Sequence, residues 1–342
     1  MLLVVCGAGA SYDSVSSRLP SKHPPDQLSD RPPLADELFA DRQGFVAIMD
    51  RYPELRPLVP RLQHLTQGRS LEQVMEQIRR EGETNPVRLK QLAAIRYYLQ
   101  AIIWRCQARW LKEAHNITNY VTLFDRIEHT RLKDEQVCIV TFNYDTLIEE
   151  ALPIVNVSIT DIEKYPQHHY ALFKLHGSVD WARRVDSVDK YPGDADAARL
   201  AHALIDDAAA LKLGDAYVKI SSYPPPREYG VPLFPAIALP VEQKREFECP
   251  QRHLKFLRES LGEVRKALII GWRGTESHFL DLVREKQRHS INVLAACGNK
   301  DESERTIQRI KKAGVQCNSH STAVGFTDLV VGDELGEFLA IK

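Results

Sequence analysis

The chain has 342 residues, 44% of them hydrophobic, which is sufficient for one large core with insertions or for two domains. Its 45 Lys and Arg residues nearly balance its 46 Asp and Glu residues, so the formal net charge is -1. This balance gives no support to broad adsorption to nucleic acid or to membrane surfaces.

The cysteines and the first residues indicate the cellular compartment. Six cysteines lie far apart, and no two of them form a C-x-x-C pair. The apolar run at the start of the sequence is short and has no basic residues before it, so it resembles a buried strand rather than a signal peptide. No stretch approaches the roughly 18 apolar residues of a membrane span. We therefore expect a reduced cytoplasmic protein without a membrane segment.

The first third of the chain is predicted to be one strand followed by helices. Leu2–Val5 is an apolar run closed by the small residues Gly7–Ser11, a pattern typical of a strand, a tight turn and a helix start. Residues 12–33 are rich in Ser, Pro and Asp and predict a loop over the site. From residue 34 to about 133 the apolar residues repeat at helical spacing, as between Leu71 and Ile78.

Strand signals return in the middle of the chain. Val137–Phe142 is a continuous apolar run, as expected for a parallel strand buried on both faces. Further strands are predicted at Ile154–Ile159 and Ala171–Leu175. One helix is expected within residues 183–213, and the Pro-spaced segment Val231–Pro240 predicts an extended loop.

The last third alternates between helices and strands. The predicted helices are 251–265, 279–287, 302–312 and 329–339, and the predicted strands are 267–270, 291–296 and 315–318. This alternation predicts an α/β protein with a Rossmann-like, doubly wound parallel sheet and a helical insertion module. The core is expected to comprise residues 1–40, 136–182 and 264–342. Residues 41–135 form the helical insertion, and residues 183–263 form a second insertion.

Three polar or glycine-rich segments each follow a predicted strand. Gly7-Ala8-Gly9-Ala10-Ser11 would let backbone amides approach a pyrophosphate, although Tyr12 stands at the third glycine position of a dinucleotide fingerprint. Asn143 and Asp145 could contact ribose hydroxyls and water, or one of them could cap the following helix. His176, followed by Gly177, could transfer a proton near neutral pH, or act only as a structural hydrogen-bonding group.

These segments carry a family resemblance. Gly7–Ser11, Thr141–Asp145 and Lys174–Ser178, in this order, resemble the three signature motifs of the sirtuin superfamily, and are most similar to its bacterial sirtuin-like NADase branch, which is associated with defence against phage. Ile269–Trp272 resembles that branch's late strand and Gly-aromatic turn, which includes Gly271. The resemblance covers the predicted Rossmann core and leaves both insertions out.

The resemblance implies a role for each motif residue. Gly7, Ala8, Gly9 and Gly271 would hold NAD, and Ser11 would lie against its phosphate or ribose. Asn143 and Asp145 would contact the nicotinamide ribose and hold the attacking water. His176 would be the general base, so Asn143 and His176 are the predicted catalytic pair.

The cysteine pattern separates two activities of this superfamily. Its protein deacylases carry a four-cysteine zinc ribbon after the His-Gly motif, but here that interval contains only Cys249. We therefore expect no metal, and hydrolysis of NAD to nicotinamide and ADP-ribose in place of deacylation. The second insertion takes the place of the ribbon.

The same resemblance implies a biological role and partners. It implies an effector that depletes NAD in anti-phage defence by abortive infection, and that works as a homo-oligomer. The sequence has no P-loop, so its trigger is expected to be a separate protein, such as a ring-forming ATPase translocase, or an oligomeric transition made through the helical insertion at residues 41–135.

Two rival functions stay open. One is a non-catalytic module that senses NAD or ADP-ribose. The other is an NAD-dependent oxidoreductase, which needs an acidic residue about 20 positions after the glycine turn. Its candidates, Asp26 and Asp30, lie in the Pro- and Ser-rich loop, which disfavours it.

Overall fold

The computed structural model describes residues 1–16, 30–65, 69–132, 134–186, 191, 196–228, 230–242, 246–322 and 324–341. The chain forms two compact units, each assembled from separate stretches of sequence. Unit 1 comprises Met1–Leu28, Trp110–Leu175 and Gln251–Lys342, and unit 2 comprises Ser29–Arg109 and His176–Pro250.

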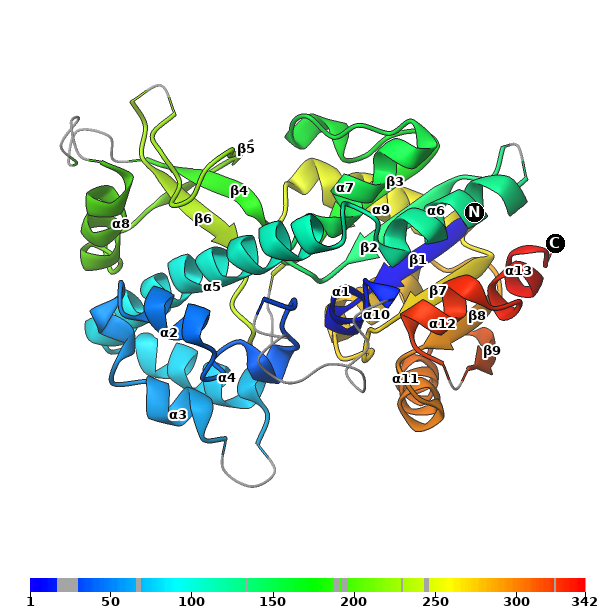
Figure 1. The fold of residues 1–342 in the computed structure, drawn as a ribbon, viewed down its shortest axis with the longest axis horizontal. Helices are drawn as coiled ribbons and strands as arrows, with labels where there is room; N and C mark the ends of the chain where they lie inside the picture. Colours follow the sequence, from blue (N-terminus) through cyan, green and yellow to red (C-terminus); the bar gives the residue numbers. More distant parts are fainter. Residues whose placement is uncertain are drawn as a thin grey trace. The chain divides into compact units, whose positions relative to one another are not determined.

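Unit 1 is built around a six-stranded parallel sheet (Figure 1). Its strands are β1 (Leu2–Cys6), β2 (Val137–Thr141), β3 (Tyr170–Lys174), β7 (Lys266–Ile270), β8 (Ile291–Ala296) and β9 (Cys317–Ser321). Their order across the sheet is β3-β2-β1-β7-β8-β9, and each neighbouring pair is parallel. This is the strand order of a dinucleotide-binding Rossmann sheet, so the predicted fold class is confirmed.

The burial of the strands explains why they are apolar. Every residue of β1, β2, β3 and β7 is buried, because helices cover both faces of a parallel sheet. In β9, at the edge of the sheet, Asn318 and His320 are exposed and alternate with half-buried residues. The central strands therefore have continuous apolar sequences, whereas the edge strand alternates.

The helices of unit 1 fall into groups. They are α1 (Ala8–Tyr12), α6 (Asn119–Thr130), α7 (Leu147–Ala151), α9 (Gln251–Ser260), α10 (Ser277–Lys286), α11 (Lys300–Lys312), α12 (Phe326–Val331) and α13 (Glu334–Leu339). Helix α6 packs against α7, α12 and α13, and Figure 1 shows α6, α12 and α13 side by side along the sheet. Helix α9 packs instead against α10 and β3. Short 3-10 turns occur at Leu152–Val155, Ile162–Lys164 and Leu261–Glu263.

Unit 2 combines helices with a small antiparallel sheet. Its helices are α2 (Gln43–Met49), α3 (Val59–Gln63), α4 (Leu71–Gly82), most of α5 (Pro86–Glu113) and α8 (Ala197–Asp206), with 3-10 turns at Ala35–Glu37 and Pro53–Leu55. The sheet has the order β5-β4-β6, formed by β4 (Gly177–Val185), β5 (Leu213–Lys219) and β6 (Leu233–Ile237). The buried side chain of Gln100 in α5 donates to the Val179 carbonyl at 2.8 Å, which ties α5 to β4.

Two predicted segments differ from the structure. Ile154–Ile159 was expected to be a strand, but it begins inside the 3-10 turn Leu152–Val155 and continues through Asn156, whose φ of 61° is left-handed and incompatible with a strand. Val231–Pro240 was expected to be a loop, but it contains β6. Pro235 is tolerated there because β6 is an edge strand, where a missing amide removes no second ladder bond.

The boundaries of the two observed units also differ from those of the predicted domains. The prediction assigned all of residues 41–135 to the insertion, yet α6 belongs to unit 1 and packs against α7 and α12. Helix α5 crosses from unit 2 into unit 1. Most of the predicted loop at residues 12–33 lies outside the described residues.

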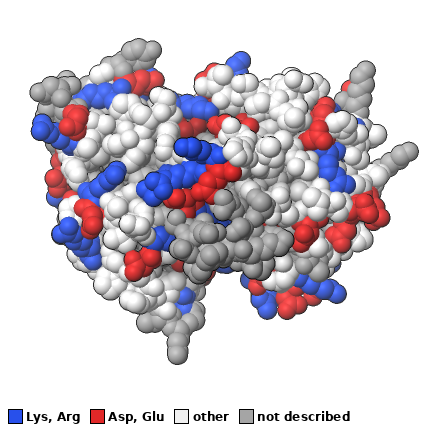
Figure 2. Space-filling view, viewed as in Figure 1, with Lys and Arg blue, Asp and Glu red and all other residues white. Residues whose placement is uncertain are grey.

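The surface carries mixed charge. Figure 2 shows acidic and basic side chains interspersed over the described part of the visible face. Among the helices in the described ranges, none is both long and apolar enough to cross a membrane.

Candidate functional site

The glycine turn after β1 packs directly on the turn after β7. The amide of Gly7 donates to the Ile270 carbonyl at 3.0 Å, and the amide of Gly9 donates to the Gly271 carbonyl at 3.1 Å. A β-carbon on Gly7 would lie 2.6 Å from the Gly271 oxygen, and one on Gly271 would lie 2.2 Å from the Ala10 nitrogen. These glycines are therefore required by the close approach of two backbone turns. The Gly7 and Gly9 amides have backbone partners, which departs from the expectation that they would face a pyrophosphate.

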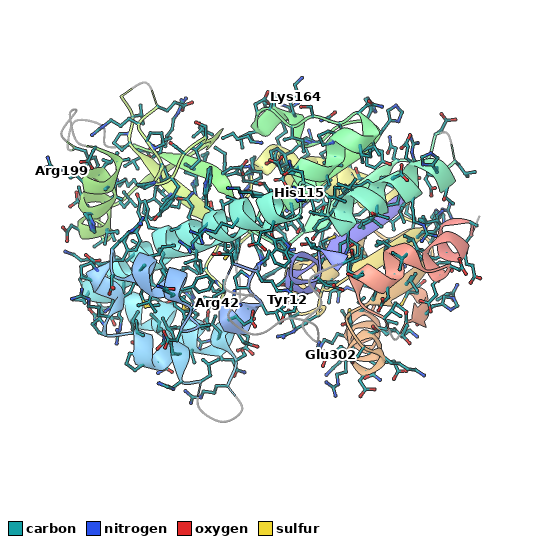
Figure 3. The ribbon with its side chains drawn as sticks, in the orientation of Figure 1. Tyr12, Arg42, His115, Lys164, Arg199 and Glu302 are labelled. Atoms are coloured by element: carbon teal, nitrogen blue, oxygen red, sulfur yellow. The ribbon has the colours of Figure 1, made fainter. Side chains whose placement is uncertain are left out.

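Ser11 follows this turn and lies in α1, which ends at Tyr12 (Figure 3). Only 2% of Ser11 is exposed, and its hydroxyl oxygen lies 2.9 Å from Asn143 Nδ2. The turn after β1 is thus joined to the segment after β2 by a buried side-chain hydrogen bond.

Asn143 is held in one orientation by several hydrogen bonds. Its backbone amide donates to Thr141 Oγ1 at 3.1 Å, which fixes the first residues beyond β2. Its side-chain nitrogen Nδ2 donates to the Gly7 carbonyl at 2.9 Å and to Ser11 Oγ at 2.9 Å. Because a carbonyl oxygen can only accept, Nδ2 must face Gly7 and the acceptor Oδ1 must face away from it. Asn143 is therefore oriented to offer an acceptor.

Asp145 supports the helix that follows. Its Oδ1 accepts a hydrogen bond from the amide of Leu147, the first residue of α7, at 3.2 Å, and only 7% of Asp145 is exposed. Of the two roles left open by the sequence, the described contact is the one to the helix start.

A buried lysine braces the same segment from β3. Lys174 is 0% exposed, and its ammonium donates to the Asp145 carbonyl and to Glu149 Oε1, the latter at 2.8 Å. Tyr165 donates to the same carboxylate oxygen at 3.0 Å. The end of β3 is in this way tied to the turn that carries Asn143 and Asp145.

Aromatic rings form the apolar support of Asn143. Phe142, directly before it, stacks on Trp272 with ring centroids 5.4 Å apart, and both contact Phe279 edge-on. Since Trp272 directly follows Gly271, this cluster links the β2 and β7 turns through packing as well as through the backbone.

His176 begins the second stretch of unit 2 and is 3% exposed. Its carbonyl accepts from the Ala238 amide at 2.9 Å, beyond the end of β6. The next residue, Gly177, has a φ of 77°, and a β-carbon there would lie 1.9 Å from the Ala236 oxygen. The glycine of the His-Gly pair is therefore required by the pairing of β4 with β6.

Several predicted site residues come together in unit 1. Gly7, Gly9, Ser11, Asn143 and Gly271 are joined by the hydrogen bonds and close approaches above. His176 belongs to unit 2 and has its own surroundings there.

One residue of this cluster was not identified from the sequence. Tyr120, in α6, is 0% exposed, and its hydroxyl lies 3.3 Å from Ser11 Oγ. It belongs to none of the three motifs, and its helical surroundings predict only a core position.

The structure disfavours one of the two candidate acidic residues for the oxidoreductase interpretation. Asp30 forms ion pairs with Arg105 at 3.1 Å and Arg109 at 2.8 Å, within unit 2. Its carboxylate therefore stabilises the attachment of α5, while Asp26 lies outside the described residues. Among the described residues, no group of His, Cys, Asp and Glu is arranged to hold a metal ion.

Comparison with protein families relates part of the chain to a known domain. Residues 137–213 match the SIR2-like domain, a segment that begins with β2 and includes Asn143, His176 and β4. No curated protein matches the chain. The match supports a relationship to the sirtuin-like superfamily, whose members are NAD-dependent enzymes, and it supports an NAD-related function in general.

Proposed function

We propose that this protein is an NAD glycohydrolase that cleaves NAD to nicotinamide and ADP-ribose. The observation that carries the proposal is the fixed carboxamide of Asn143, whose Nδ2 is committed to Gly7 and Ser11. Its Oδ1 is left as an oriented acceptor for a water molecule or a ribose hydroxyl. Asn143 also lies inside the segment that matches the SIR2-like domain.

The proposed reaction is a displacement at the anomeric carbon of the nicotinamide ribose. The bond between C1′ and the pyridinium nitrogen breaks, and its electron pair neutralises nicotinamide as it leaves. The oxygen of water forms the new bond to C1′, and one water proton passes to a base. NAD and water thus give nicotinamide, ADP-ribose and one proton. Asn143 would position the water, which is the main task when the leaving group is good.

His176 is proposed as the base. Thr141 and Lys174 are register partners at the ends of β2 and β3, and Asn143 and His176 each follow two residues further along the chain. Both lie within residues 137–213, the matched segment. A general base contributes about 10²–10⁴-fold to a rate, so its removal is expected to abolish most turnover.

The cysteine pattern favours hydrolysis over deacylation. After His176 the sequence has only Cys249, Cys297 and Cys317, and no C-x-x-C pair from which a zinc ribbon could be built. Water, rather than an acyl-lysine side chain, is therefore the proposed partner of NAD.

The test is release of nicotinamide and ADP-ribose from NAD by the purified protein, followed by chromatography. Asn143→Ala and His176→Ala should each lose at least about 100-fold in rate. The matched control is His168→Ala, which removes an exposed histidine near β3 and should keep full activity. Binding of NAD without release of nicotinamide would support the sensing module instead, and oxidation or reduction of a substrate would support the oxidoreductase.

We further propose that this activity depletes NAD during phage infection and is switched on by a separate sensor. The support is the resemblance to the bacterial NADase branch and the lack of a P-loop in this sequence. The proposed sensor is a protein such as a ring-forming ATPase translocase, and the proposed active form is a homo-oligomer in the cytoplasm. NAD consumption should rise when the protein encoded by a neighbouring gene is added. Full activity of the chain alone would contradict this part.

A further inference from the structure

We propose that Tyr120 is a positioning residue, which holds the Ser11 hydroxyl and, through it, the Asn143 carboxamide in place for the two hydroxyls of a ribose. The inference rests on the proposed function, because it assigns the ligand of the same site. It adds a residue outside the glycine turn and outside the segment matched to the SIR2-like domain.

Tyr120 is held firmly in the core of unit 1. Its side chain is wholly buried, and its ring packs edge-on against Phe326 of α12, with centroids 5.0 Å apart. Helix α6 therefore presents a rigid phenol to α1. The hydroxyl lies 3.3 Å from Ser11 Oγ, and either oxygen could be the donor on distance alone.

The Tyr120 hydroxyl is linked to Asn143 through Ser11. Ser11 Oγ lies 3.3 Å from the Tyr120 hydroxyl and 2.9 Å from Asn143 Nδ2, which donates to it. Ser11 Oγ is therefore the atom that joins the phenol to the carboxamide.

The phenol keeps its proton throughout. Burial raises the pKa of Tyr120 well above its ordinary value, and this outweighs the hydrogen bonds from Ser11 and Asn143, which lower it. The Tyr120 hydroxyl is thus neutral, and its link to Ser11 is an ordinary hydrogen bond between two hydroxyls.

The consequence concerns the positions of the two polar groups. Ser11 Oγ accepts from Asn143 Nδ2 and shares a hydrogen bond with Tyr120, so its position is fixed from two sides. Asn143, with Nδ2 committed, offers Oδ1 as an acceptor. A fixed hydroxyl beside a fixed amide oxygen suits a pair of hydroxyls on neighbouring ribose carbons, each of which can both accept and donate.

The experiment removes the phenolic oxygen alone. Tyr120→Phe keeps the ring that packs on Phe326, and kcat for NAD hydrolysis should fall about tenfold while KM changes by less than about twofold. The matched control is Tyr98→Phe. Tyr98 is also wholly buried and donates one hydrogen bond, to the Leu38 carbonyl at 2.9 Å, but it lies in unit 2. The control should lose a similar amount of stability and keep its kcat.

A double variant tests the link between the two hydroxyls. Ser11→Ala breaks the same hydrogen bond from the other side, so Ser11→Ala/Tyr120→Phe should be no slower than Ser11→Ala alone. Equal kcat values for Tyr120→Phe and Tyr98→Phe, or fully additive losses in the double variant, would overturn the inference.

A second readout does not depend on catalysis. The side-chain amide resonances of Asn143, assigned by their loss in Asn143→Ala, should shift in ligand-free Tyr120→Phe and stay in place in Tyr98→Phe. If the wild-type protein releases no nicotinamide, the proposed function fails while this comparison still decides the inference. Unchanged Asn143 resonances in Tyr120→Phe would overturn it.

Discussion

The amide of Gly9 donates to the carbonyl of Gly271 at 3.1 Å, and no side chain fits between the two residues. Glycine at both positions lets the turns after β1 and β7 touch through their backbones. The conformation of the turn that leads to Ser11 consequently depends on contact with Gly271, which lies far along the sequence.

Replacing Gly271 should therefore be costly. Gly271→Ala introduces strain at a φ of 57° and a contact of 2.2 Å with the Ala10 nitrogen, so the free energy of unfolding should fall by at least about 2 kcal/mol. Gly298→Ala is the control, since Gly298 also has a positive φ but no atom within 4 Å of its β-carbon position. It should cost about 1 kcal/mol. Urea unfolding measures both, and equal losses would contradict the packing argument.

The buried pair of Lys174 and Glu149 gives a prediction about charge. Lys174→Met leaves a carboxylate buried without its ammonium partner, and unfolding should become easier by about 3–5 kcal/mol. Adding Glu149→Gln should restore part of this loss, because Tyr165 can still donate to the amide oxygen. Lys300→Met, which breaks an exposed pair with Glu304, should leave the urea midpoint almost unchanged. A double variant no more stable than Lys174→Met would show that the loss does not come from the unpaired Glu149 carboxylate.

Replacing Asn143 by aspartate, which has nearly the same shape, should lower the stability of the protein. Asn143→Asp replaces the donor to Gly7 by a carboxylate, so a buried carbonyl loses its partner and faces a negative charge. The free energy of unfolding should fall by about 2 kcal/mol at neutral pH, and the loss should shrink in acid, where the introduced carboxyl is protonated and can donate. Asn318→Asp, at an exposed position of β9, serves as the comparison in thermal unfolding. Similar melting shifts in both variants would speak against the proposed orientation.

His253 should make the stability of unit 1 depend on pH. Its Nε2 donates to the Ile162 carbonyl at 2.9 Å, and burial lowers its pKa to about 4, from the ordinary value of about 6.5. Below pH 6.5 the unfolded chain binds a proton at His253 that the folded chain does not bind. The contribution of neutral His253 to the free energy of unfolding is therefore complete above pH 6.5 and is lost as the pH falls towards 4. The loss should reach about 3 kcal/mol.

Urea unfolding between pH 4 and pH 7 measures this dependence. His253→Gln keeps a donor for Ile162 and cannot titrate, so its unfolding free energy should be flatter over this interval. Identical slopes for the wild type and His253→Gln would show that another group is responsible.

Five strands of the parallel sheet, β1, β2, β3, β7 and β8, were predictable because burial on both faces requires continuous apolar runs, as in Val137–Thr141. The edge strand β9 lacks such a run, and the strand predicted at residues 315–318 overlaps it only at Cys317 and Asn318. The antiparallel sheet was not predictable. Its strand β6 contains Pro235, and its strand β5 has half-buried and exposed residues, so neither shows a clear strand pattern. The false strand at Ile154–Ile159 had suitable residues, but Asn156 breaks it.

The candidate site also contains residues that the sequence predicts and residues that it does not. The proximity of Ser11 and Asn143 could be predicted, because parallel strands place their carboxyl ends at one edge of the sheet. Tyr120 could not, since it reaches Ser11 across 109 positions of sequence from a helix with an ordinary core pattern. A hydroxyl that projects from such a helix leaves no periodic signal.

The position of β1 has a consequence during synthesis. Leu2 pairs with Val137 on one side and with Lys266 on the other, so the middle of the sheet leaves the ribosome long before either neighbour. At about 5–20 residues per second, the second neighbour follows roughly 13–53 seconds later. During that interval an apolar segment, fully buried in the finished protein, is exposed to other nascent chains. The yield of folded protein should consequently depend on translation speed and chaperone supply more than on the final stability of the sheet.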